Sequence, residues 1–178
     1  MPIGSWLKAH RKQVIIHTLI VGGFLLFLLF LAEPLFDRLE AVEGESKLCD
    51  FPLPAETGGI TYCFDELPTD GRTTVEVSGW AFIDGQDSEN SEIYIVLKSA
   101  DRTYIFGTET WMREGVTQHF KELDLNLDYS GFMALLPARK LADGEYTVGI
   151  YIRKGDMEAL QYTNKAVTKS KGVVQLTG

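Results

Sequence analysis

The segment EIYIVLKS, residues 92–99, alternates apolar side chains with polar or aromatic ones and predicts one strand of an antiparallel sheet. The segment EYTVGIYIR, residues 145–153, repeats this pattern. The side chains expected to share the core face are Ile93, Ile95, Leu97, Tyr146, Val148, Ile150 and Ile152. The alternate positions, Tyr94 and Tyr151 among them, are expected to face water.

Other short runs of β-branched and aromatic residues are separated by Gly, Asp, Asn and Ser, which favour turns. They cover residues 59–64, 73–83, 102–108, 132–137, 158–163 and 172–177. Without helical crossovers, this number of strands predicts a mainly β chain folded as an antiparallel β-sandwich, with a barrel as the alternative. Near Gly79 the apolar pattern shifts from Val77 to Trp80, which predicts a β-bulge and a buried Trp80.

The run QVIIHTLIVGGFLLFLLFLA, residues 13–32, is almost wholly apolar and long enough to span a bilayer as one helix. Lys8, Arg11 and Lys12 precede it and acidic residues follow it, which predicts a cytoplasmic N-terminus at the plasma membrane. The alternative is a cleaved signal peptide, but its apolar centre is shorter and ends at small residues. The run therefore predicts an uncleaved, single-pass signal-anchor in contact with lipid.

This anchor divides the chain into four predicted parts. They are a cytoplasmic tail (1–12), a transmembrane helix (13–32), an amphipathic connector with a linker (33–58) and an extracytoplasmic β-sandwich (59–178). The formal net charge of the whole chain is -8. Because the basic residues of the tail contribute positive charge, the rest of the chain is more negative than this total. A domain this acidic repels phosphate backbones, so nucleic acid is not an expected partner.

Cys49 and Cys63 both fall on the predicted outer side, where disulfides are stable. Their proximity in sequence predicts a disulfide that ties the linker to the first strand. The alternative is two small buried thiols. A structural zinc would need histidines near the cysteines, and the sequence provides none there.

Two acidic segments offer the oxygen ligands that calcium prefers. In DGQDSENS, residues 84–91, these ligands are Asp84, Asp87, Glu89 and Asn90. The alternative for this loop is a solvated turn. In DLNLD, residues 124–128, the spacing resembles a calcium loop, but Tyr129 replaces the turn glycine and the interleaved leucines fit an edge strand.

Catalytic signals are scarce, because His119 is the only histidine after the predicted anchor and no catalytic or phosphate-binding motif is present. An enzyme would require Asp84, Asp87 or His119 to converge in one cleft. We therefore expect a non-enzyme without a cofactor.

Aromatic side chains are the main candidates for binding. Tyr94, Trp111 and Tyr151 are the predicted partner-binding residues, and an exposed sheet face bearing them would also suit glycan stacking. The alternative is ordinary packing on the sheet. Several exposed coplanar rings on one face would favour a glycan.

Three segments together resemble a group of known proteins. They are VSGWAFIDGQDSENSEIYIVLKS (77–99), DYSGF (128–132) and DGEYTVGIYI (143–152). They resemble extracytoplasmic immunoglobulin-like β-sandwich modules of bacterial and archaeal envelope proteins. The resemblance implies an accessory or scaffolding subunit of a membrane-protein complex, with an envelope glycan-binding module as the alternative.

Overall fold

The computed structural model describes residues 11–28, 30, 44–65 and 73–177, in two compact units, Met1–Gly44 and Glu45–Gly178. In the first unit, α2 (Arg11–Phe27) is a helix of 17 residues. Within the described ranges, no helix has both the length and the apolar character that crossing a membrane requires. Residues 1–10, residue 29 and residues 31–43 lie outside the described part, and with them parts of the predicted tail, anchor and connector.

The second unit is built from strands. They are β1 (Leu48–Cys49), β2 (Ile60–Phe64), β3 (Thr74–Ile83), β4 (Glu92–Lys98), β5 (Thr103–Gly107), β6 (Glu109–Trp111), β7 (Gly131–Pro137), β8 (Gly144–Lys154), β9 (Met157–Ser170) and β10 (Val173–Thr177). The helical turns are α4 (Glu114–His119), η2 (Lys121–Leu123), η3 (Asp128–Ser130) and η4 (Ala138–Lys140). All strand pairs are antiparallel, which confirms the prediction of a mainly β, antiparallel chain.

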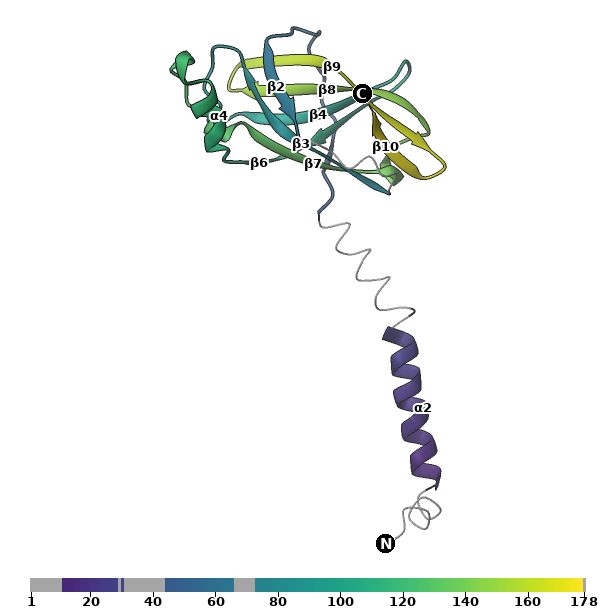
Figure 1. Ribbon diagram of the computed structural model, residues 1–178. Helices are drawn as coiled ribbons and strands as arrows, with labels where there is room; N and C mark the ends of the chain where they lie inside the picture. The colour runs from purple at the N-terminus through teal and green to yellow at the C-terminus, as the bar shows by residue number, and fades with distance from the viewer. Residues whose placement is uncertain (1–10, 29, 31–43, 66–72, 178) are drawn as a thin grey trace. The chain divides into compact units, whose positions relative to one another are not determined.

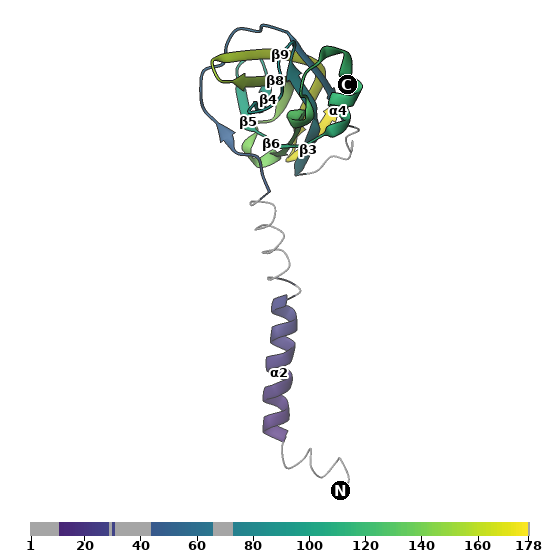
Figure 2. The same ribbon diagram turned by 90° about the vertical axis from the view of Figure 1, so that its left-hand side faces the viewer.

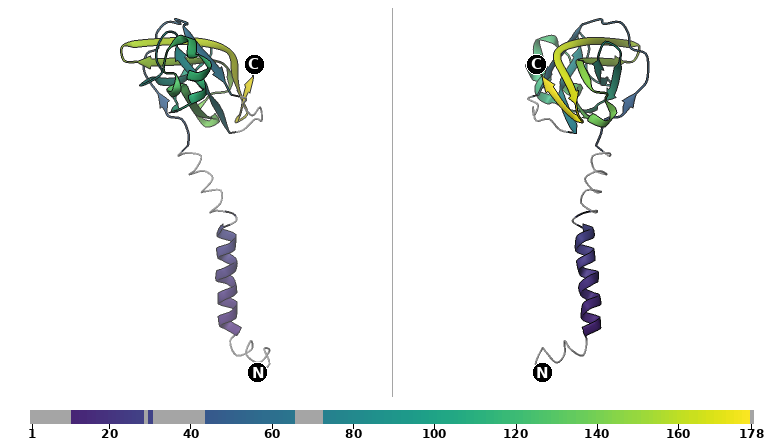
Figure 3. Two further views of the ribbon diagram at one scale, coloured as in Figure 1. Left: turned by 60° about the vertical axis from the view of Figure 1, so that its left-hand side comes forward. Right: turned by 90° about the vertical axis from the view of Figure 1, so that its right-hand side faces the viewer.

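The strands form two layers (Figures 1 and 2). One sheet has the order β1-β5-β4-β8-β9-β10 and the other the order β2-β3-β7-β6. β2 contacts β9, β3 contacts β8 and β10, and β5 contacts β7, so the two sheets lie face to face as a sandwich. Figure 3 shows the C-terminal strand β10 beside β9, with which it pairs along its whole length.

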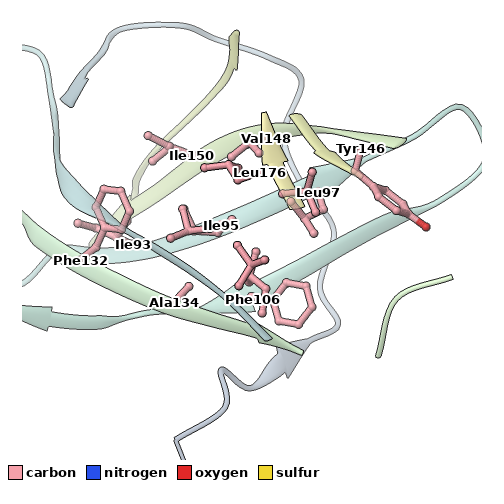
Figure 4. Packing of buried hydrophobic residues seen from close by; sticks show 14 of the residues in the cluster. Ile93, Ile95, Leu97, Phe106, Phe132, Ala134, Tyr146, Val148, Ile150 and Leu176 are labelled. Atoms are coloured by element: carbon pink, nitrogen blue, oxygen red, sulfur yellow. The ribbon is translucent and has the colours of Figure 1, made fainter. Parts of the chain in front are cut away.

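The core lies between the layers. Ile95, Val148 and Ile150 of one sheet and Phe132 and Ala134 of the other are all fully buried, and Figure 4 shows them together. Every side chain predicted for the core face of residues 92–99 and 145–153 belongs to this cluster. The alternation therefore identified the core face correctly, since successive strand side chains point to opposite sides.

The opposite face of the larger sheet is not fully exposed to water, contrary to expectation. Val96, Tyr151 and Leu160 are buried there beneath Phe51 and Leu53. The amide groups of Thr57 and Gly58 also donate hydrogen bonds to the carbonyl oxygen of Leu160. The stretch predicted as a linker thus packs on the sheet, and the compact unit begins at Glu45 rather than at residue 59.

Tyr151 gives this buried face a measurable pH signature. Its hydroxyl donates to Glu158 Oε2 at 2.9 Å, and burial together with this bond raises its pKa from 10.0 to about 12. The stability that Tyr151 contributes is therefore full below pH 10.0 and is lost as the pH rises through about 12. We expect Tyr151→Phe to remove the latest step from a titration of tyrosinate absorbance, and an unchanged latest step would contradict this burial.

The bulge predicted at Gly79 is wrong. The pairing of β3 with β7 runs through Gly79 without a register shift, and its pairing with β2 is regular from Gly79 to Ile83. The apolar pattern changes because both faces of β3 are covered there: Ala81 joins the core, whereas Phe82 is buried on the outer side. Trp80 shares that outer side and is partly exposed rather than buried.

Candidate functional site

Four outward-facing positions form one row across the smaller sheet. Cys63 of β2 is paired with Trp80 of β3, Trp80 with Gly131 of β7, and Gly131 with Trp111 of β6. Adjacent strands lie about 4.8 Å apart, so the backbones of the two tryptophans are separated by about 10 Å with a glycine between them. The row therefore presents two indoles with a gap in the middle.

The segment between β6 and β7 covers part of this outer face. Phe120, which follows α4, packs edge-on against Trp80 and Phe82 with ring centroids 5.5 and 5.4 Å apart. Val116 of α4 and Leu127 are buried in the same cluster. Trp80 also stacks on Phe82, with an interplanar angle of 15°. Figure 2 shows α4 beside β3, on the side of that strand away from β4 and β8.

Arg113 crosses the row. Its guanidinium donates two hydrogen bonds to the carboxylate of Asp65, at 3.0 and 3.2 Å, and so connects the end of β6 to the end of β2. A Cβ atom at Gly131 would lie 2.8 Å from Cγ of Arg113 and 2.7 Å from the carbonyl oxygen of Trp111. Glycine is therefore required at position 131 for the arginine to pass over the sheet.

These elements enclose a groove of about 690 Å³. Its lining residues are Cys63, Trp80, Trp111, Met112, Arg113, Gly115, Val116, His119 and Phe120. Ligand sites in proteins have volumes of about 300–1,000 Å³ and combine mostly apolar walls with a few polar groups. We refer to this surface as the tryptophan groove. Its size and chemistry make it a candidate binding site.

The loop 84–91 and the segment 124–130 hold the wall of the groove in place. The carboxylate of Asp87 accepts a hydrogen bond from the amide of Asn126 at 2.7 Å. Ser88 Oγ accepts from the amide of Tyr129 at 3.0 Å and donates to the carbonyl oxygen of Asn126 at 3.3 Å. The two segments considered as separate calcium loops are therefore bound to each other, and residues 124–128 do not form the edge strand considered for them.

A substitution at Ser88 tests this contact. Ser88 is 1% exposed, so Ser88→Ala removes two hydrogen bonds that water cannot replace. We expect the free energy of unfolding to fall by about 2 kcal/mol. Glu89→Ala, on the exposed part of the same loop, should change it by less than about 0.5 kcal/mol. Equal effects of the two substitutions in urea unfolding would contradict a structural role for Ser88.

Two of the candidate calcium ligands, Asp84 and Asp87, have other partners. Asp84 Oδ1 accepts a hydrogen bond from the hydroxyl of Thr61 at 2.6 Å, and the carboxylate of Asp87 accepts one from the amide of Asn126. Glu89 is exposed. Within the described ranges, no three His, Cys, Asp or Glu side chains are grouped to hold a metal ion. Nor do Asp84 and Asp87 join His119 in the groove, as an enzyme built on these residues would require.

The predicted disulfide is not formed, because Cys49 and Cys63 are both free thiols. Cys49 lies in β1 and Cys63 in β2, which are edge strands of different sheets. Since β2 contacts β9 whereas β1 pairs with β5, the two thiols lie toward opposite edges of the sandwich. Cys63 is exposed and lines the tryptophan groove.

The three predicted partner-binding residues do not share a surface. Trp111 lines the groove, but Tyr94 and Tyr151 belong to the other sheet and pack on Phe51 with centroid distances of 5.1 and 5.8 Å. Tyr151 is 2% exposed, and the two tyrosine rings are tilted by 34°. They therefore form no exposed coplanar platform, and ordinary packing is the correct interpretation for Tyr151.

Sequence reasoning missed Trp80, Met112 and Arg113 as groove residues. A signal was present in the tripeptide Trp111-Met112-Arg113, because these three residue types are enriched in the cores of protein interfaces. Trp80 gave no such signal, since its place beside Trp111 depends on the pairing of β3 and β6 with β7.

Comparisons with protein-family models, curated proteins and solved structures found no match to this chain.

Proposed function

We propose that this protein is a non-catalytic, membrane-anchored accessory subunit, whose β-sandwich binds a protein partner in a membrane complex through the tryptophan groove. Residues 13–32 would hold the chain in the plasma membrane, with the N-terminus in the cytoplasm and the sandwich outside. The role is one of positioning, since an anchored domain meets a membrane-bound partner at high effective concentration.

The composition of the groove carries this proposal. Trp80, Trp111, Met112 and Arg113 lie together around an open depression. Aromatic residues, methionine and arginine are enriched at the buried centres of interfaces, and tryptophan and arginine are the most frequent hot spots. Met112 is 49% exposed, although it is a large apolar side chain that burial against a partner would stabilise.

We further infer that the sandwich is immunoglobulin-like. β2, β3, β7 and β6 correspond to strands A, B, E and D of that fold, and β5, β4, β8 and β9 to C′, C, F and G. The hydroxyl of Tyr146, near the start of β8, donates to the carbonyl oxygen of Ala142 at 2.8 Å, as in the tyrosine corner of such domains. Both observations support the resemblance noted in the sequence.

The exposed thiol of Cys63 provides a test of membrane topology. A membrane-impermeant maleimide should label the protein in intact cells, and Cys63→Ser should remove most of that label. In a chain without native cysteines, Ser5→Cys should be labelled only after the cells are opened. Labelling of Ser5→Cys in intact cells would contradict the proposed orientation.

Extraction of the native protein in a mild detergent tests the proposed association. We expect one membrane protein to be recovered with it in stoichiometric amount, as identified by mass spectrometry. Recovery of the protein alone in several mild detergents would contradict a stable accessory subunit.

An envelope glycan-binding module is the second candidate. The observation that favours it is the pair of indoles, Trp80 and Trp111, close to the ion pair of Arg113 and Asp65. Aromatic faces can stack on sugar rings while charged groups hydrogen-bond their hydroxyls. Binding of purified envelope polysaccharide by the full chain, lost in Trp111→Ala, would select this function over the first.

A further inference from the structure

We propose that the tryptophan groove receives an extended, basic segment of the partner protein, which pairs with the outer edge of β6 and places a cationic side chain against Trp111. This inference rests on the proposed function and specifies the chemistry of the partner. It follows from three features of β6 and its surroundings: an open strand edge, an indole and exposed carboxylates.

The first feature is the strand edge. β6 ends the four-stranded sheet and, among the described strands, pairs only with β7. An edge strand has a row of backbone N–H and C=O groups that an extended peptide can pair with, which is a common mode of peptide recognition. Glu109 and Thr110 are exposed, so a peptide has access to this edge. The groove begins at Trp111, the last residue of the same strand.

The second feature is the indole. Glu109 and Trp111 are two residues apart on β6 and therefore share its outward face. A side chain projecting from a peptide paired beside them would reach the same face. Tryptophan is the aromatic side chain that attracts a cation most strongly, and the aliphatic stem of lysine or arginine can also cover an apolar wall. Met112 and Val116 provide such a wall.

The third feature is charge. Arg113 is the permanently cationic side chain in the described groove lining, and its charge is matched by Asp65 at 3.0 Å. Glu109 on β6 and Glu114 in the first turn of α4 are exposed carboxylates on either side of Trp111. The whole chain carries a formal net charge of -8. A basic segment complements this edge, and a basic residue opposite Glu109 forms a favourable cross-strand pair.

The test measures peptide binding to the full-length chain in detergent micelles. Trp6→Phe leaves Trp80 and Trp111 as the only indoles, so that tryptophan fluorescence reports on the groove. The probe is a short, capped peptide of alternating arginine and valine. Its first control has glutamate in place of arginine, and its second has the same basic sequence with alternate backbone amides N-methylated. We expect saturable binding of the probe, with both controls binding at least about tenfold more weakly.

Charge reversal in the protein gives a matched pair of variants. Glu109→Lys should weaken binding of the basic peptide about tenfold, whereas Glu145→Lys, on β8 of the other sheet, should leave it nearly unchanged. Equal binding of the glutamate peptide or of the N-methylated peptide would overturn the inference. Equal effects of the two substitutions would do the same, because binding would then follow net charge alone.

The two proposals can fail separately. If Trp111→Ala loses the native partner but none of the peptides binds, the groove still contacts a partner and only the basic, extended chemistry is wrong. If Trp111→Ala retains the native partner, the groove is not the contact surface and both proposals fail.

Discussion

Gly79→Ala should strongly destabilise the protein. A Cβ atom at this position would lie 2.2 Å from the carbonyl oxygen of Cys63 and 3.0 Å from Cα of Phe64. Both contacts are with backbone, so no side-chain rotation can relieve them. β2 would have to separate from β3, and we expect the free energy of unfolding to fall by about 3 kcal/mol or more.

Urea unfolding measures this loss, and Gly115→Ala is its matched control. Gly115 lies in α4, where an added Cβ meets no atom within 4 Å. Alanine is also about 1 kcal/mol more favourable than glycine inside a helix. Gly115→Ala should therefore be neutral or stabilising. A Gly79→Ala protein as stable as the wild type would show that β2 and β3 are not paired as described.

Trp111→Ala should abolish recovery of the partner while leaving the sandwich folded. Trp111 is partly exposed on an edge strand of three residues, so its removal takes little from the core. If it is a hot spot of the interface, its truncation weakens binding by about 2–4 kcal/mol. Each 1.4 kcal/mol of binding free energy corresponds to about tenfold in affinity, so this loss is enough for the complex to dissociate during purification.

Leu123→Ala is the control for that substitution. Leu123 is an apolar side chain of η2 that is 45% exposed and lies outside the groove lining. The variant should retain the partner in a parallel extraction, and both variants should unfold cooperatively in urea. Loss of the partner from both would point to a general effect of the segment between β6 and β7 rather than to the groove.

The core was predictable where the pattern is local. The alternation of Ile93, Ile95 and Leu97 follows from the pleat of a single strand, and it identified the core face without reference to other strands. The burial of Tyr151 was not predictable in this way. Its burial depends on Phe51 and Leu53, which lie far away in the sequence and give no periodic signal.

The candidate site was predictable only in part. Trp111 was a candidate binding residue by its type alone, and it lines the groove. Trp80 was assigned to the core because the pattern around Gly79 suggested a bulge, whereas the regular strand has two covered faces. Likewise, Asp87 and Asn126 have the side chains of calcium ligands, but the hydrogen bond from the backbone amide of Asn126 to the carboxylate of Asp87 depends on loops brought together by the sandwich.

Site-specific photocrosslinking in living cells tests the role of the groove most directly. A benzophenone side chain would replace Met112, which is 49% exposed in the groove, or Met157, which is 43% exposed on β9 of the other sheet. The tryptophan groove as partner surface predicts a strong crosslink from position 112 to one membrane protein and little from position 157. Crosslinks to the same protein from position 157 but not from position 112 would contradict it.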